Sequence, residues 1–148
     1  MTVTFREARR DEVPAIMDLI ADDVLGAGRE GTDPQIYFEA FDRMANEPGN
    51  YIIVGVQGPR IVAVYQLTFL NGLALQATLR AQLESVRVAS DLRGQGIGRM
   101  LIADAEARAK AAGCGLVQLT MNAARTGSHA FYTAQGFVNS HVGFKKEI

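Results

Sequence analysis

The chain has 148 residues, of which 48% are hydrophobic and 21% are charged, and its formal net charge is −1. These values are typical of one globular domain spanning residues 1–148, and they argue against a broad nucleic-acid surface and against a membrane-spanning segment. The single cysteine, Cys114, excludes an internal disulfide and disfavours a cysteine-based zinc site, so we expect a cytoplasmic protein with no metal and no nucleic-acid or membrane partner.

The first third of the chain predicts one strand followed by two helices. Residues 2–8 alternate apolar and polar side chains, which indicates a short strand. A helix is expected within residues 9–25, and a glycine-containing loop at 26–34 should end it. A second helix is predicted over 35–45, with Asp33 as its N-cap. The apolar residues of the first helix fall at helical spacing, at Val13, Ile16, Met17, Ile20 and Val24.

The middle of the chain predicts a β-hairpin and a further strand. Residues 51–56 and 61–70 are apolar runs joined by the turn residues 57–60. The stretch 71–78 gives no clear indication of structure. Residues 79–90 alternate and predict a strand. Their alternation places one set of side chains on one face, Glu84, Val86 and Val88, and another set on the opposite face, Leu83, Ser85 and Arg87.

The last third predicts helix, strand, helix and strand. The first helix should run to about residue 112, since Gly113 suits a left-handed position after a helix end. A strand is expected at 116–122, a short helix at 128–137 and a last strand at 140–148. The whole order predicts an α/β protein with a mixed sheet of six or seven strands and about four helices. A strand, helix and strand in succession further predict that the strands at 79–90 and 116–122 are parallel.

The stretch DLRGQGIGRML places three glycines directly before a helix. Gly94, Gly96 and Gly98 lack Cβ atoms, so the backbone can adopt positive φ and approach a ligand closely. The N–H groups and the dipole at a helix start attract anions, and Arg93 and Arg99 add positive charge. The stretch therefore predicts a site for a pyrophosphate. The alternative is a tight helix start with no ligand.

Two common nucleotide motifs do not fit this stretch. The dinucleotide pattern G-x-G-x-x-G fails because its third glycine position holds Arg99 or Leu101, depending on the starting glycine. A Walker A motif is absent because no Gly-Lys-Ser/Thr follows. The glycines therefore do not predict NAD or ATP as the ligand.

The stretch VRVASDLRGQGIGRML resembles the acyl-CoA-binding motif of the GNAT acetyltransferase superfamily, in which a strand runs into R-x-x-G-x-G/A and a helix. Arg93, Gly96 and Gly98 occupy the motif positions. Residues 130–137, AFYTAQGF, resemble the later signature of this superfamily, and residues 19–30 are similar to a bacterial subgroup with poorly defined acceptors. The resemblance implies the GNAT acyl-CoA N-acyltransferase fold and acetyl-CoA as the acetyl donor.

The resemblance also implies where acetyl-CoA binds. Its pantetheine arm should pair with the backbone near Val86 and Val88, and its pyrophosphate should lie over the glycine loop. The N–H group of Val88 is the expected donor to the thioester oxygen. Many relatives have an asparagine at the position of Arg125, and the resemblance transfers the cofactor role of that asparagine to the nearby Asn122. The alternatives for Arg125 are contact with a CoA phosphate and simple solvation. The predicted cofactor-binding residues are Val86, Arg87, Val88, Arg93, Gly94, Gln95, Gly96, Ile97, Gly98, Arg99, Asn122 and Arg125.

Two residues are predicted to be catalytic. Tyr132 matches the family tyrosine near the CoA sulfur, and a protonated phenol can donate a proton to the leaving thiolate. Glu84 is the candidate base that removes a proton from the attacking ammonium. The alternatives are that Tyr132 only packs between a helix and the sheet, and that Glu84 pairs with Arg80 or Arg87 or is simply exposed. Some members of the family have a glutamate on the next strand. The strand at 116–122 has none, so the resemblance implies that the base is either Glu84 or solvent.

These observations predict an enzyme that transfers acetyl from acetyl-CoA directly to a primary amine of a small molecule. Asp22, Asp23 and Glu30 flank the loop that often lines the acceptor site in this family, where they would favour a cationic amine. The alternatives are a non-catalytic acyl-CoA-binding regulatory protein and a protein or peptide N-acetyltransferase. The resemblance to this family suggests a homodimer, while the composition leaves the oligomeric state open.

Overall fold

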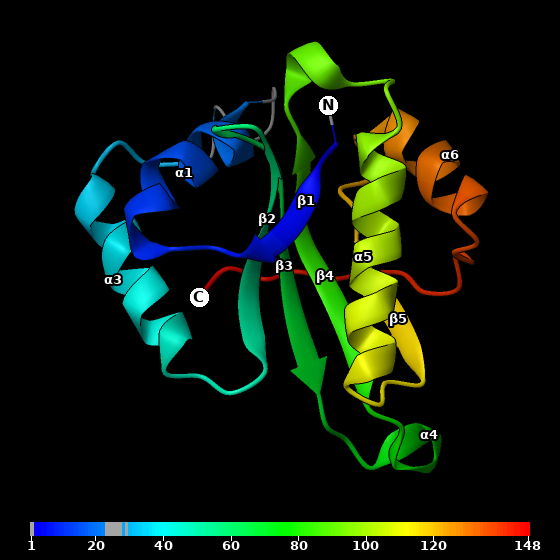
Figure 1. The fold of residues 1–148 in the computed structure, drawn as a ribbon. Coiled ribbons are helices and arrows are strands. Elements are labelled where there is room, and N and C mark those ends of the chain that lie inside the picture. The colour runs from blue at the N-terminus through cyan, green and yellow to red at the C-terminus, as the bar shows by residue number, and fades with distance from the viewer. Residues whose placement is uncertain (1, 23–27, 29) are drawn as a thin grey trace. The chain divides into compact units, whose positions relative to one another are not determined.

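The computed structural model describes residues 2–22, 28 and 30–148, which fall into two units, residues 1–118 and 119–148. A sheet with the strand order β1-β2-β3-β4-β5 gives the first unit its frame (Figure 1). The described part of the chain therefore has five strands, fewer than the six or seven expected. Val24 and Asp23, which the sequence assigned to the first helix and its end, lie outside the described residues.

The first three strands form an antiparallel meander. β1 (Thr4–Glu7) pairs with β2 (Asn50–Gln57), and β2 pairs with β3 (Arg60–Leu70), as the sequence predicted for 2–8 and for the hairpin. Gly55 is required on β2, since a Cβ there would lie 2.8 Å from the ring of Phe5. These strands form the base against which the helices pack.

β4 (Arg80–Val88) contains a bulge that changes which side chains share a face. Gln66 of β3 lies opposite Glu84, but Val64 lies opposite Arg87, so β4 has one extra residue between these pairs. Ser85 adopts a φ of 52°, as expected where a strand is kinked by an inserted residue. The expected alternation is therefore wrong beyond Glu84, because the extra residue places Arg87, and not Val88, on the face of Glu84.

β4, α5 (Ile97–Ala111) and β5 (Leu116–Leu119) form the predicted crossover. The N–H of Gly115 donates to the carbonyl of Leu79 at 2.9 Å, and the side chain of Gln118 bonds Gln82 at 2.9 Å. In both contacts the residue on or beside β5 follows its partner by the same number of positions, which is 36 for Gln118 and Gln82. A constant separation means that the two strands advance in the same direction, so they are parallel. Gly113 has a φ of 86° at the end of α5, as predicted.

Helices cover both faces of the sheet. α1 (Val13–Ala21) begins with Pro14 in its first turn and packs its buried residues against Val54 and Val64. The neighbouring residue Tyr65 points to the other face, where its hydroxyl donates to Asp104 of α5 at 2.6 Å. Burial, and then this hydrogen bond, raise the pKa of Tyr65. α3 (Pro34–Ala45) starts as predicted, because Asp33 accepts a hydrogen bond from the N–H of Gln35 at 3.0 Å.

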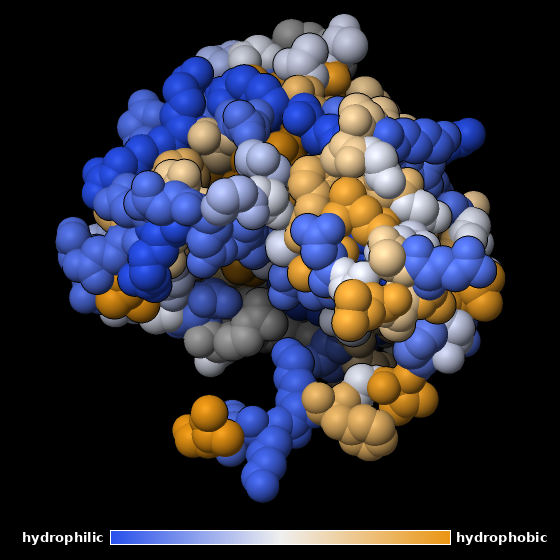
Figure 2. Space-filling view, turned by 90° about the horizontal axis from the view of Figure 1, so that it is seen from below, coloured by the Kyte–Doolittle hydropathy of each residue, from blue (hydrophilic) through white to orange (hydrophobic). Residues whose placement is uncertain are grey.

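The connection from β3 to β4 has an unusual backbone. Its short helix α4 (Ala74–Ala77) has positive φ at Leu75, Gln76 and Ala77, a conformation that side-chain-bearing residues rarely adopt. Leu73 is 95% exposed and Leu75 is 61% exposed. Figure 2 looks onto the end of the molecule where Figure 1 shows α4, and hydrophobic side chains are visible on this surface.

The second unit contains α6 (Thr126–Ala134), which the sequence predicted at 128–137. Gly136 follows it with a φ of 92°. The strand expected at 140–148 is wrong, since these residues have no regular structure. Within the described residues no neighbouring strand pairs with this segment, and an extended segment without a partner leaves its backbone groups without the hydrogen bonds of a sheet.

Candidate functional site

The glycine loop between β4 and α5 exposes the start of a long helix. Gly94 has a φ of 79° and Gly96 has a φ of 84°, and a Cβ at either position would meet no atom within 4 Å. Gly96 is the N-cap of α5, and among the described residues no side chain forms a capping hydrogen bond at this helix start. Ile97 is buried and fixes the first turn, while Gln95 and Arg99 are exposed. The N–H groups of the first turn are therefore available to an anion from solvent.

Side chains from distant parts of the chain support this loop. A guanidinium N–H of Arg93 donates to the carbonyl of Asp22 at 3.2 Å, and the N–H of Ser90 donates to the carboxylate of Asp22 at 3.4 Å. Arg60 binds both carboxylate oxygens of Asp91, at 2.9 and 2.7 Å, and this hydrogen-bonded pair lowers the pKa of Asp91. The end of α1 and the start of β3 thus hold the segment that leads into the glycines.

The second half of β4 passes the end of β5. Gln118 lies beside Gln82, and β5 ends one residue later at Leu119, whereas β4 continues to Val88. The N–H of Ala89 donates to the carbonyl of Val62 on β3 at 2.8 Å. Because successive residues of a strand direct their N–H groups to opposite sides, the N–H of Val88 points away from β3. This edge can accept an extended ligand as an additional strand.

Val86 and Arg87 lie on this part of β4, directly after the bulge at Ser85. A guanidinium N–H of Arg87 donates to the carbonyl of Val86 at 2.9 Å. Nothing in the sequence indicates the bulge, because serine does not require a positive φ. Bulges are frequent next to active sites, where they redirect a strand edge. Ser85 is therefore a residue of the candidate site that sequence reasoning missed.

Glu84 is exposed, and it lies on β4 opposite Gln66. Within the described residues it forms no ion pair with Arg80 or Arg87. Arg80 instead donates to the side chain of Gln118 at 3.2 Å. The sequence left open whether Glu84 pairs with an arginine or is exposed to solvent, and in the structure its side chain is exposed. An exposed carboxylate on this face can take up a proton from an incoming ammonium, directly or through water.

The remaining predicted site residues belong to the second unit. Tyr132 is half-buried in α6 and packs edge-to-face on Phe131 and Phe137, with ring centroids 5.2 and 5.7 Å apart. The side chain of Asn122 accepts a hydrogen bond from the N–H of Ala124 at 2.9 Å, which shapes the turn before α6. Arg125 is the N-cap residue of α6. The cofactor contacts of Asn122 and Arg125 and the catalytic role of Tyr132 stay predictions.

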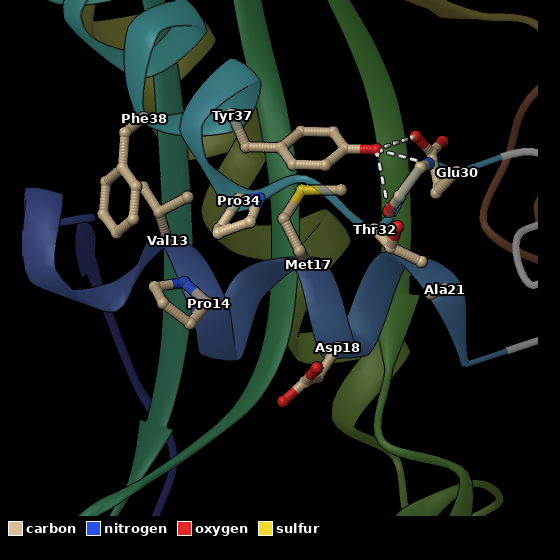
Figure 3. Close-up of a pocket in the computed structure, with 11 residues that line it drawn as sticks. Val13, Pro14, Met17, Asp18, Ala21, Glu30, Thr32, Pro34, Tyr37 and Phe38 are labelled. Atoms are coloured by element: carbon tan, nitrogen blue, oxygen red, sulfur yellow. Dashed lines mark hydrogen bonds between the residues drawn. The ribbon is translucent and has the colours of Figure 1, made fainter.

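A cavity of about 320 Å³ lies between α1 and α3 (Figure 3). Tyr37 points across it, donates to the carboxylate of Glu30 at 3.2 Å and accepts from the N–H of Gly31 at 2.7 Å. Of the acidic residues expected at the acceptor site, Glu30 thus lines this cavity and Asp22 supports the glycine loop. Asp23 lies outside the described residues.

No group of three or more His, Cys, Asp and Glu side chains lies in an arrangement that could hold a metal ion in the described part of the chain. No helix in residues 2–22 or 30–148 combines the length and the apolar character needed to cross a membrane.

Known proteins resemble the chain over most of its length. The model of the Acetyltransferase (GNAT) family matches residues 13–137. An aminoalkylphosphonate N-acetyltransferase of Salmonella typhimurium is 28% identical over 116 residues, which are 78% of this chain and 75% of the relative. A crystal structure of a transcriptional regulator from Bacillus halodurans C-125 is 40% identical with a TM-score of 0.95, covering 99% of this chain and 100% of that one. A candidate acetyltransferase of Agrobacterium tumefaciens str. C58 is 28% identical with a TM-score of 0.86, covering 98% and 99%.

Proposed function

Because the chain belongs to the GNAT acetyltransferase family and resembles a known N-acetyltransferase, we propose that it transfers acetyl from acetyl-CoA to the primary amine of a small molecule. The observation that supports acetyl-CoA binding at this site is the exposed, uncapped start of α5 behind two glycines with positive φ. These N–H groups, with Arg93 and Arg99, fit the pyrophosphate of CoA.

The edge of β4 would hold the rest of the donor. The pantetheine arm contains two amide groups, which can pair with strand backbone as a further strand does. The stretch of β4 that runs past the end of β5, from Val86 to Val88, offers such an edge beside the glycine loop. The N–H of Val88 would then donate to the thioester oxygen.

The proposed reaction is a direct transfer. The amine nitrogen attacks the thioester carbon, and the negative charge that develops on the oxygen is stabilised by the N–H of Val88. The carbon–sulfur bond then breaks, and the CoA thiolate takes a proton from Tyr132. The nitrogen loses its second proton as the neutral amide forms, and this proton passes through solvent to the Tyr132 phenolate, which restores the phenol. The acceptor is an ammonium at neutral pH and must lose a proton before it attacks, so Glu84 accepts this proton, directly or through a water molecule.

The test is release of CoA from acetyl-CoA in the presence of a panel of primary amines, with the acetylated product identified by its mass. The panel includes aminoalkylphosphonates, since a relative is named for them, together with amino sugars, polyamines and a lysine peptide. Turnover with a small amine and not with the peptide supports the proposal. Turnover with the peptide alone would assign the protein to the protein N-acetyltransferases.

A second candidate function is a non-catalytic regulator that binds acyl-CoA. It is favoured by the transcriptional regulator from Bacillus halodurans, which is 40% identical and covers the whole fold. This alternative predicts acetyl-CoA binding without turnover on any amine. It also predicts that acetyl-CoA changes the binding of a partner macromolecule, which pull-down from lysate with and without acetyl-CoA measures.

We also propose that the protein is located in the cytoplasm. The single thiol of Cys114 needs no oxidising compartment, and burial raises its pKa, which lowers its reactivity. Fractionation of cells that express the tagged protein tests this location. Gel filtration at several concentrations tests whether the protein forms the homodimer left open above.

A further inference from the structure

The sheet face that α1 covers becomes polar toward one end. Val54 and Val64 on this face are fully buried with α1. Further along the same face, Thr68 and Gln82 are half-buried and Glu84 is exposed. The opposite face of the same strands stays apolar, with exposures of 1% or less at Leu67, Ala81 and Leu83. The polar side chains therefore lie on one face only, directly beside the proposed base.

Gln82 belongs to a hydrogen-bonded series of three polar side chains that crosses β4 and β5. Arg80 donates to the amide oxygen of Gln118 at 3.2 Å, and the amide nitrogen of Gln118 donates to the amide oxygen of Gln82 at 2.9 Å. Arginine can only donate, so the bond to Arg80 fixes the orientation of the Gln118 amide and, through it, that of Gln82. The chain consequently ends in the NH2 group of Gln82.

This hydrogen-bonded series of side chains ends next to Glu84. Residues 82 and 84 are alternate residues of β4 and point to the same face, about 7 Å apart along the strand. The bulge at Ser85 follows, and there β4 begins to run past the end of β5. The carboxylate of Glu84 and the NH2 group of Gln82, which the guanidinium of Arg80 polarises through Gln118, thus lie side by side. They lie where the edge of β4 that would hold the pantetheine arm begins.

We propose that Gln82, Gln118 and Arg80 bind an anionic oxygen group of the acceptor while Glu84 binds its ammonium. This inference rests on the proposed function and narrows its acceptor to short zwitterionic amines that carry a carboxylate, phosphate or phosphonate group. The chain from Arg80 supplies the positive charge and the fixed NH2 donors that such an oxygen needs. The short distance between residues 82 and 84 matches an amine and an oxyanion separated by a few bonds.

The experiment measures binding without turnover. The wild-type protein is saturated with CoA, which has no acetyl group to transfer, and titrated calorimetrically with three ligands of similar length. These are 2-aminoethylphosphonate, β-alanine and n-propylamine. We expect at least one of the two zwitterions to bind about tenfold or more tightly than propylamine, as a charge-assisted hydrogen bond provides. The two zwitterions distinguish a phosphonate from a carboxylate.

Variants identify the residues responsible. Arg80→Gln removes the charge, and Gln118→Leu interrupts the chain while leaving Arg80 in place. Each should reduce the preference for the zwitterion to less than about threefold. Arg43→Gln is the matched control, because Arg43 is an exposed arginine in the last turn of α3, and it should keep the wild-type preference. Thermal melting verifies that each variant is folded.

The inference is overturned if wild-type protein binds all three ligands equally or binds none, or if folded Arg80→Gln and Gln118→Leu proteins both keep the preference. Failure of the proposed function is seen separately, as absence of CoA release with acetyl-CoA and any amine. A protein that prefers zwitterions but releases no CoA would retain the inference on the ligand class and reject the catalytic assignment.

Discussion

Tyr132 and Glu84 are the side chains to which the proposed reaction assigns proton transfers. We predict that Tyr132→Phe lowers kcat about 100-fold, because it removes the proton donor for the CoA thiolate and leaves the aromatic packing intact. The affinity for acetyl-CoA should change less than about twofold. Steady-state kinetics and a calorimetric titration measure the two quantities. Tyr51→Phe, on β2 beside Phe69, is the control, and unchanged kcat in Tyr132→Phe would remove Tyr132 from the mechanism.

Glu12 is a residue whose charge stabilises the fold itself. Its carboxylate binds Arg6 at 2.6 and 3.0 Å and accepts the N–H of Arg9 at 2.8 Å. The bonds from Arg6, and then that from Arg9, lower the pKa of Glu12 from 4.5 to about 2. Because the pKa is lower in the folded state, the stabilisation is complete above pH 4.5 and is lost as the pH falls toward 2.

Glu12→Gln should therefore lower the free energy of unfolding by about 2–3 kcal/mol at pH 7. Urea unfolding at a series of pH values measures this difference between wild type and variant. The difference should shrink as the pH falls from about 4.5 toward 2. A difference that is independent of pH would show that the charge of Glu12 contributes nothing to it.

The element that defines the site is the glycine loop with the start of α5. Gly96→Ala and Gly113→Ala form a matched pair, since both glycines have positive φ, at 84° and 86°, and a Cβ at either would meet nothing within 4 Å. We predict that each substitution lowers the free energy of unfolding by about 1 kcal/mol through backbone strain. Only Gly96→Ala should also weaken acetyl-CoA binding, by about tenfold or more. Equal affinities of the two variants would show that the loop does not contact the ligand.

The bulge in β4 gives a second prediction at this scale. Ser85 has a φ of 52°, which glycine adopts without strain and a β-branched residue tolerates poorly. Ser85→Gly should leave the free energy of unfolding unchanged within about 0.5 kcal/mol or raise it, whereas Ser85→Val should lower it by more than about 1 kcal/mol. Urea denaturation of both variants measures this. Equal stability of the two would indicate a strand without a bulge.

At the scale of the whole molecule, most elements and the crossover could be predicted from the sequence. Asp33, Gly113, Gly94 and Gly96 are residues whose local chemistry determines a helix end or a turn, and the structure places each where that chemistry requires. Gly98, the third glycine expected before the helix, is instead the second residue of α5 and does not have a positive φ. The bulge at Ser85 could not be predicted, because pairing with β3 and not residue type produces it. The prediction of a strand at 140–148 was wrong for a related reason. An alternating sequence forms a strand only where a neighbouring strand pairs with it, and the alternation does not show whether one is present.

The candidate site could be predicted only in part. Two motifs predict the pyrophosphate loop and Tyr132, and Glu84 was predicted separately, as a carboxylate on the strand that precedes the first motif. The chain from Arg80 through Gln118 to Gln82 joins residues 38 and 36 positions apart. Each of these residues alone is an ordinary polar residue of a strand, so their association becomes visible only when β4 and β5 lie side by side.

The most direct test of the central claim is thermal melting of the purified protein with acetyl-CoA, CoA and NAD in parallel. A ligand that binds only the folded state raises its stability by about 2.7 kcal/mol at a hundredfold excess over Kd, which raises Tm by about 5–10 °C for a chain of this size. We predict this rise with acetyl-CoA and CoA and no rise with NAD. An unchanged Tm with acetyl-CoA at millimolar concentration would contradict the account and leave the glycines as a structural helix start.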